Sequence, residues 1–283
     1  MGYSEYWGLS GSVFNEVCDT RFFFESDDHR ESLDRLLYIA NDKNMNMGLL
    51  TGEVGSGKTI TKKVFENSLP VQNFETISFD NSNFNFTDIL YDITSRISFR
   101  DPRIEMTSST KVPVRGDKYQ LMTLFKEKLE ALVYEDKRHL LIIFDEAQQI
   151  ESTVLDELKN LTNISSDTEN FVTIFFVGQP ELREKVREMK QINQRVYLRF
   201  HLNNLDYKNT VNYIQHRLRV GGRSSGAIFT QAAYELIFRR TEGIPREINR
   251  LCKLALTFGF ASELKEITEN DILVIIEDMD RHG

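Results

Sequence analysis

The chain has few cysteines and no long apolar run among its 283 residues. Its two cysteines, Cys18 and Cys252, lie far apart without the spacing of metal ligands, which fits a reducing compartment and suggests no catalytic role for either. No stretch approaches the ~20 apolar residues of a bilayer-crossing helix, and the N-terminus lacks a basic, apolar secretion signal. We therefore expect a soluble, cytoplasmic protein without a membrane span.

An excess of basic residues is also absent. The chain has 35 lysines and arginines against 43 acidic residues, a net charge of -8, and its isoelectric point is about 5.3. Surfaces that bind nucleic acid tightly are usually basic, so this balance leans against tight DNA binding without deciding it, because local patches count. With 40% hydrophobic residues, the chain can build a sizeable core in one large or two small domains.

What the chain does contain is a glycine-rich segment that fits the phosphate-binding pattern Gly-x-x-x-x-Gly-Lys-[Ser/Thr] at every fixed position. Its residues are Gly52, Glu53, Val54, Gly55, Ser56, Gly57, Lys58 and Thr59. The glycines allow successive N–H groups to converge on a phosphate, the lysine neutralises phosphate charge, and Thr59 offers a hydroxyl to Mg²⁺. A short apolar stretch precedes the segment and a helix-compatible stretch follows it. The sequence therefore predicts binding of a nucleoside triphosphate such as ATP.

Two acids end an apolar run later in the chain. Residues 140–144 are all apolar and lead into Asp145 and Glu146. Such a run suits a central strand of a parallel sheet, and ligands bind at the carboxyl ends of these strands. We expect Asp145 to hold Mg²⁺, directly or through water, and Glu146 to polarise the water that attacks the γ-phosphate.

Four further polar residues are candidates for contacts with the phosphates. Gln179 follows a third strand-like run at residues 171–177 and could hydrogen-bond the γ-phosphate or the attacking water. Arg195 and Arg199 precede a short strand-like piece at 200–202, where each is either a surface charge or an arginine finger donated to a neighbouring subunit. Arg246 follows a Gly-Ile-Pro turn at the expected start of a helix. We favour the finger role for one of the two arginines without choosing between them.

Strand and helix signals alternate from residue 47 to about 202, as an α/β fold with a parallel sheet requires. After residue 205 only helical periodicity remains. We therefore predict a P-loop α/β domain over residues 1–205, with an N-terminal extension at 1–45, and a small α-helical lid domain over 206–283.

The ordered set of glycine loop, acidic pair, glutamine, paired arginines and Gly-Ile-Pro-Arg resembles the AAA+ ATPases. Within them, the chain is most similar to the ExeA/GspA family of secretion-associated ATPases, and the similarity covers nearly the whole length. The segments that carry the resemblance are residues 6–9, 19–24, 29–33, 50–59, 145–148, 177–182 and 243–252. A departure occurs at residues 12–14, Ser-Val-Phe, where family members often have Pro-Phe.

The resemblance implies roles for the polar candidates and a biological output. Gln179 matches the sensor 1 residue, and Arg246 matches the sensor 2 arginine of the lid. The family implies Mg²⁺-dependent ATP hydrolysis in an ATP-dependent homo-oligomer, a ring or a filament, that drives or times assembly of a secretion or pilus machine. The alternative is a DNA-binding regulator of transposition target selection, because such ATPases resemble the same core and also occur as compact soluble proteins. Duplex DNA would then be a partner.

Residues 96–118 do not fit a regular element. They contain two prolines, a Thr-Ser-Ser-Thr run, six basic and three acidic residues. A loop of this length within a domain is usually functional or disordered. We leave two interpretations open: a disordered segment, or a surface that touches nucleic acid or a client protein.

Overall fold

The computed structural model describes residues 2–81, 84–100, 103–104, 117–223 and 227–282. Two compact units make up the chain. The sheet unit comprises Glu31–Gly52 and Thr61–His201. The helical unit comprises Met1–Arg30, Glu53–Ile60 and Leu202–Gly283. Each unit has a hydrophobic core of its own.

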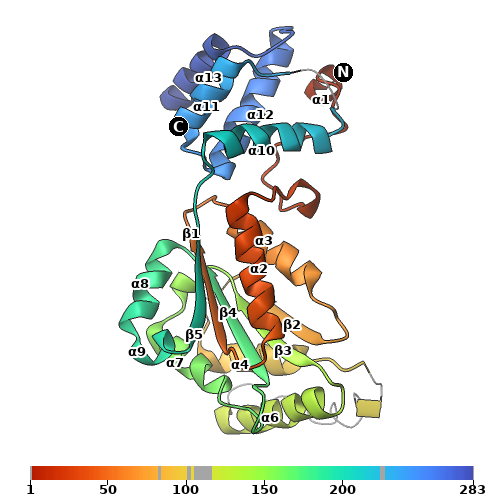
Figure 1. Ribbon diagram of the computed structural model, residues 1–283, viewed down its shortest axis with the longest axis vertical. Helices are drawn as coiled ribbons and strands as arrows, with labels where there is room; N and C mark the ends of the chain where they lie inside the picture. Colours follow the sequence, from red (N-terminus) through yellow and green to blue (C-terminus); the bar gives the residue numbers. More distant parts are fainter. Residues whose placement is uncertain (1, 82–83, 101–102, 105–116, 224–226, 283) are drawn as a thin grey trace. The chain divides into compact units, whose positions relative to one another are not determined.

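A five-stranded sheet with the order β2-β3-β4-β1-β5 is the centre of the sheet unit (Figure 1). Neighbouring strands β2 and β3, β3 and β4, and β4 and β1 pair in parallel. The three inner strands are buried along their whole length, as continuous apolar runs predict. The strands are β1 (Met47–Gly52), β2 (Phe74–Phe79), β3 (His139–Phe144), β4 (Val172–Gly178) and β5 (Val196–Leu202).

Helices cover both faces of this sheet. On one face, Phe65 of α3 packs edge-on against Phe175 of β4, and a Cβ on Gly48 of β1 would meet both Ile39 of α2 and Phe175. On the other face, Phe125 of α6 and Leu155 of α7 join Phe176 of β4 in the main core. Adjacent strand residues thus serve opposite faces, as the two-residue period of a strand requires. The helices that contribute to this unit are α2 (Asp27–Asn41), α3 (Lys58–Ser68), α4 (Phe86–Arg96), α6 (Lys118–Tyr134), α7 (Ser152–Leu161), α8 (Pro180–Glu188) and α9 (Lys190–Asn193).

The parallel register brings the carboxyl ends of three strands to one edge of the sheet. Thr51 of β1 pairs with Gly178 of β4, and Phe144 of β3 pairs with Phe176 of the same strand. The residues that follow these strands therefore begin at this edge, where open α/β sheets bind ligands.

The helical unit is built from the C-terminal helices and the first residues of the chain. Trp7 is buried and donates its indole N–H to the Leu256 carbonyl at 2.8 Å, and Phe14 is buried in the same core. The described residues 2–30 thus belong to the same unit as the C-terminal helices, whereas the sequence led us to join them to the α/β domain. The helices are α1 (Tyr3–Tyr6), α10 (Tyr207–Val220), α11 (Gln231–Thr241), α12 (Pro245–Ala261) and α13 (Glu269–His282), with the 3-10 turn η1 (Thr20–Phe22).

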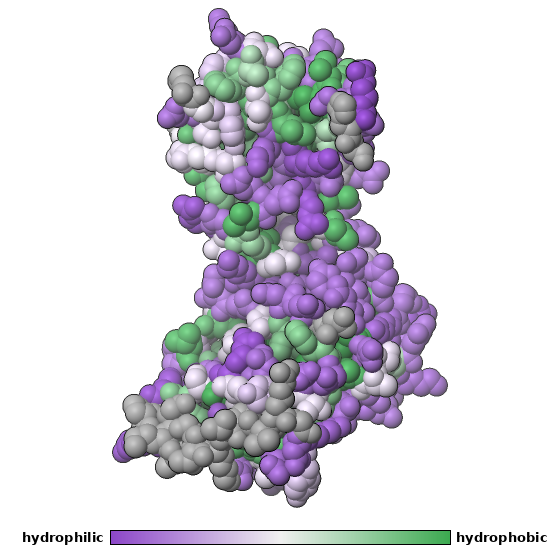
Figure 2. All heavy atoms as spheres, turned by 180° about the vertical axis from the view of Figure 1, so that it is seen from behind, coloured by the Kyte–Doolittle hydropathy of each residue, from purple (hydrophilic) through white to green (hydrophobic). Residues whose placement is uncertain are grey.

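The surface of the helical unit mixes hydrophobic and hydrophilic side chains on the face that Figure 2 shows. Exposed apolar residues of this unit include Leu254, Leu273 and Val274. Scattered apolar side chains are ordinary on protein surfaces. Within the described part of the chain, none of the helices has the length and apolarity that a bilayer crossing requires.

The architecture confirms the predicted fold class, a parallel α/β sheet with additional helices. The interpretation offered for residues 96–118 mostly concerns 101–102 and 105–116, which lie outside the described residues.

Candidate functional site

The glycine-rich loop follows β1 directly and leads into α3, which begins at Lys58. Gly55 and Gly57 have φ angles of +83° and +105°, a left-handed region that side chains with a Cβ rarely adopt. The loop's own bonds include one from Ser56 N–H to the Glu53 carbonyl at 3.2 Å. Because the first N–H groups of a helix have no intrahelical partner, the start of α3 presents hydrogen-bond donors and a partial positive charge.

Within this loop, two polar side chains are in a state that suits an anion. Lys58 is 5% exposed, and its ammonium group donates to the Glu53 carbonyl of the same loop at 2.7 Å. The Ser56 hydroxyl is buried, and it has no hydrogen-bond partner among the described residues. Buried polar atoms are normally satisfied, and a bound phosphate is an acceptor that would suit this hydroxyl. Thr59, whose hydroxyl we assigned to Mg²⁺, is exposed on the first turn of α3.

The start of α12 lies against the same loop. The Arg246 N–H donates to the Gly55 carbonyl at 3.3 Å. A Cβ at position 55 would lie 2.7 Å from the Cβ of Arg246 and 3.1 Å from Ile244, so only glycine fits there. The turn before α12 is equally restricted, because a Cβ on Gly243 would lie 1.8 Å from the Leu205 carbonyl oxygen. The structure therefore brings the predicted Arg246 to the predicted phosphate loop.

His29 is a residue of this loop's surroundings that the sequence analysis did not assign a role. Its Nδ1 lies 2.6 Å from the Ser26 hydroxyl, and a Cβ on Gly57 would lie 2.8 Å from its Nε2. Burial lowers the pKa of His29 to about 4, against the weaker opposing effects of Asp28 and the Ser56 backbone. The imidazole is therefore neutral at pH 7. In the sequence, His29 stood out only as part of the segment 29–33 that carries the family resemblance. No local pattern indicates that His29 lies beside Gly57.

In the sheet unit, Asp145 and Glu146 follow β3, as predicted. Asp145 is 3% exposed, and its Oδ1 accepts the Glu146 N–H at 3.0 Å. Its Oδ2 lies 3.1 Å from the ammonium group of Lys62, which also donates to Asp80 at 2.5 Å. Burial by itself would lower the pKa of Lys62, but the hydrogen bond to Asp80 and the charge of Asp145 raise it above its ordinary value. Asp145 therefore faces a full positive charge within the fold.

Glu146 is held by two amides. Its Oε2 accepts hydrogen bonds from Gln148 Nε2 at 2.6 Å and from Gln179 Nε2 at 3.2 Å. Gln148 in turn accepts the Gln179 backbone N–H on its Oε1 at 3.1 Å. The predicted pair Glu146 and Gln179 is thus in direct contact. Gln148 was not predicted as a site residue, and its signal in the sequence was its place in the segment 145–148, which carries the family resemblance.

The two candidate arginine fingers lie elsewhere in the sheet unit. Arg195 is half-buried and donates to the Thr162 hydroxyl at 2.8 Å. Arg199 is exposed on β5 and donates to the carbonyl and side-chain oxygen of Asn193, each at 2.7 Å. Neither arginine contacts Glu146 or Gln179 in the hydrogen bonds described. A role in another copy of the chain stays a prediction.

Comparisons with known proteins identify a family and a relative of this chain. Residues 41–186 match the AAA domain family. The chain is 31% identical over 274 residues to general secretion pathway protein A of Aeromonas hydrophila, a match that covers 95% of this chain and 47% of that protein. This chain therefore spans about half the length of that relative.

Solved structures show the same fold at low sequence identity. The ORC2 protein of Aeropyrum pernix, in ADPNP and ADP complexes, has a TM-score of 0.62 and 19% identity, with 92% of this chain and 69% of that chain covered. Drosophila ORC bound to DNA has a TM-score of 0.63 and 15% identity, with 98% and 65% covered. Sequence identities this low support a shared fold and no shared function.

Proposed function

We propose that this chain, which belongs to the AAA domain family, is a Mg²⁺-dependent ATPase that binds ATP on the loop at residues 52–59 and hydrolyses it with Glu146. The observation that carries the proposal is the state of the loop. It combines left-handed glycines, a buried lysine turned onto a loop carbonyl, and a buried serine hydroxyl without a partner among the described residues. A triphosphate supplies acceptors for the Ser56 hydroxyl and for the positive charge of Lys58.

The side chains that would hold Mg²⁺ are Thr59 and Asp145. A hydroxyl and one buried carboxylate suit this ion, which keeps several waters and takes its remaining ligands from phosphate oxygens. When bound, the ion supplies charge stabilisation to the reacting phosphate. We assign the remaining site residues as predicted: Gln179 orients the attacking water, Arg246 contacts the phosphates, and an arginine of a second copy stabilises the charge that develops.

The hydrogen bonds to Glu146 support its role as the base. Gln148 and Gln179 both donate to Oε2, so the carboxylate has a defined position rather than a mobile one. A base must lie within hydrogen-bond reach of the water it activates, and pre-positioning by neighbouring amides serves that end.

The biological output that we propose follows from the relative's name. The chain is similar to a general secretion pathway protein, and we infer an ATP-dependent homo-oligomer, a ring or a filament, that assists assembly of a secretion or pilus machine. The alternative, a DNA-binding regulator of transposition, has no supporting observation in the described residues. Pull-down with a variant trapped in the ATP state, followed by identification of the bound proteins, tests the client.

The nucleotide site is tested by Lys58→Ala. We expect ATP affinity, measured by isothermal titration calorimetry with Mg²⁺ present, to fall by about 100-fold, because the variant loses the buried charge that faces the phosphates. Lys63→Ala is the matched control, since Lys63 is an exposed lysine on the same helix. Unchanged affinity in Lys58→Ala would refute the assignment of the loop.

A further inference from the structure

Lys62 of α3 lies between two carboxylates that come from the ends of two neighbouring strands. Its Nζ is 3.1 Å from Asp145 Oδ2, just after β3, and 2.5 Å from Asp80 Oδ1, just after β2. The lysine side chain is 4% exposed and the Asp145 side chain 5%, whereas the Asp80 side chain is 89% exposed. One ammonium group therefore bridges a buried acid and a solvated one.

The buried acid in this arrangement is the one that we assign to Mg²⁺. A buried carboxylate is costly unless an opposite charge compensates it. In this structure Lys62 provides that charge, at a distance close to that of a charge-assisted hydrogen bond. A divalent cation that approaches Asp145 must therefore displace the ammonium group or share the carboxylate with it.

We propose that Lys62 is a resident counter-ion of Asp145 that keeps free divalent cations from the site until ATP delivers one. This inference rests on the proposed function. Mg²⁺ alone gains too little from one carboxylate that is already neutralised, whereas the Mg²⁺·ATP complex adds phosphate ligands and the contacts of the loop. Asp80 provides the place where the ammonium group stays when Asp145 turns to the metal, so no bare lysine charge is left buried.

The position of Lys62 Nζ also indicates that a substitution of Lys62 creates a site for a divalent cation. Two carboxylate oxygens lie within 3.1 Å of that point. Without the ammonium group, the same point is flanked by two acids and one full positive charge is missing, which favours a divalent cation. A lysine that only stabilises the fold predicts something different: its loss lowers stability, and metal does not restore it.

The test uses the nucleotide-free full chain and Mn²⁺ as the probe, with the free ion measured by electron paramagnetic resonance. We expect Lys62→Met to bind one Mn²⁺ at least about tenfold more tightly than wild type, because ligand charge sets the affinity of such sites. Lys63→Met is the matched control. It removes an equal charge from the next position, and Lys63 is exposed and lowers the pKa of Asp80 through its charge. The double variant Lys62→Met, Asp145→Asn should bind Mn²⁺ no more tightly than wild type, because it lacks the carboxylate that would hold the ion.

Thermal unfolding of the same proteins gives a second readout. We expect Lys62→Met to melt below wild type in the absence of metal and to recover on addition of Mg²⁺, while wild type and Lys63→Met change little. Equal Mn²⁺ affinity in Lys62→Met and wild type overturns the proposal, and so does a destabilised variant that Mg²⁺ does not rescue.

Asp80→Asn keeps the proposal testable if Lys62→Met does not fold, because Asp80 is largely exposed. With its second partner lost, Lys62 is committed to Asp145. We expect the ratio of ATP affinities measured with Mg²⁺ and with a chelator to fall about fivefold, while affinity in the chelator is unchanged. An unchanged ratio overturns the counter-ion role alone. Absence of ATP binding to wild type refutes the proposed function instead, and the nucleotide-free Mn²⁺ measurement still decides the role of Lys62.

Discussion

Glu146 has a left-handed backbone conformation, with φ of +50°. A non-glycine residue in this region carries strain that the surrounding structure must offset, and such residues gather at functional sites. Here the offset includes the hydrogen bond from its N–H to Asp145 and the two amides on its carboxylate. This backbone conformation points two consecutive acidic side chains in different directions. Asp145 is buried beside Lys62, and Glu146 is held by two glutamines.

Replacement of Glu146 by glutamine tests its role as the base. We expect ATP turnover to fall by about 100-fold or more, because an amide cannot accept the proton of the attacking water. ATP affinity should change little, since the phosphates are assigned to the loop. Steady-state phosphate release and calorimetric titration give the two quantities. Glu151→Gln is the control, because Glu151 is exposed and its side chain makes no cap hydrogen bond. Wild-type turnover in Glu146→Gln would remove this residue from the mechanism.

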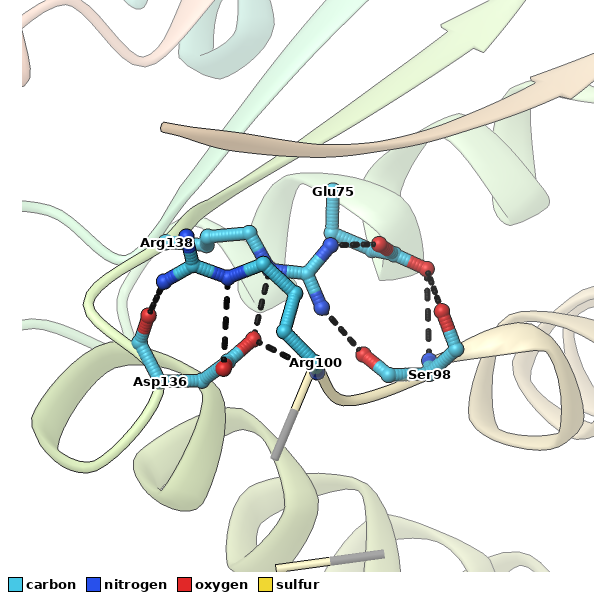
Figure 3. Close-up of polar contacts among 5 residues, drawn as sticks. All are labelled: Glu75, Ser98, Arg100, Asp136 and Arg138. Atoms are coloured by element: carbon cyan, nitrogen blue, oxygen red, sulfur yellow. Dashed lines mark hydrogen bonds and ion pairs between the residues drawn. The ribbon is translucent and has the colours of Figure 1, made fainter. Parts of the chain in front are cut away.

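At the scale of elements, a buried ion network joins β2, β3 and the turns beside them (Figure 3). Arg138, just before β3, pairs with Glu75 of β2 and donates to Asp136 at 2.6 Å and to the Ser98 carbonyl at 2.5 Å. Arg100 lies 3.4 Å from Asp136 on the more exposed side. The side chains of Arg138 and Asp136 are 6% and 3% exposed, so both charges depend on their partners.

Substitution of Arg138 by methionine should destabilise the sheet unit. We expect the free energy of unfolding, from urea denaturation, to fall by about 3 kcal/mol, because Asp136 and Glu75 would lose a buried partner. Arg100→Met removes a half-exposed member of the same network and should cost about 1 kcal/mol or less. Equal losses in the two variants would contradict the importance of burial.

The inner elements were predictable from sequence, and the edges were not. The strands expected at 140–144 and 171–177 are observed as His139–Phe144 and Val172–Gly178. β2 was not predicted, because this edge strand mixes apolar residues with Glu75, Thr76 and Ser78. β5 begins at Val196, earlier than the expected 200–202, because exposed residues interrupt its apolar pattern. A continuous apolar run marks a strand only where both faces of that strand are buried, as in β3 and β4.

At the scale of the molecule, each unit contains a buried neutral histidine. Burial lowers the pKa to about 4 for His29 in the helical unit and for His139 in the sheet unit, from an ordinary value of 6.5. Below pH 6.5 the unfolded chain takes up protons that the folded units do not, so the stability present above pH 6.5 is lost as pH falls towards 4.

We expect the free energy of unfolding to fall by about 2 kcal/mol for each of the two histidines between pH 7.5 and pH 5, from the difference in proton uptake. Urea denaturation at the two pH values measures the change. His29→Gln and His139→Gln should each lose part of this pH dependence. If both variants keep the full dependence of wild type, the histidines are not its source.

Assembly belongs to the same scale. If Arg199 acts on the nucleotide of a second copy, ATP turnover per molecule should rise with protein concentration, because association completes the site. A mixture of Arg199→Ala with Lys58→Ala protein should regain some activity, since the second variant still donates the arginine to the intact loop of the first. Turnover that is independent of concentration, together with a monomeric mass on light scattering, would contradict a site shared between copies.

The sequence by itself determined the glycine loop, the acids that follow an apolar run, and the parallel α/β fold class of this chain. These depend on local spacing and periodicity, which neighbouring residues impose. Only the tertiary structure decided that His29 lies against Gly57, that Arg246 meets Gly55, and that Lys62 bridges Asp80 and Asp145. Such contacts join residues far apart in the chain, and they form only when strand order and helix packing bring them together.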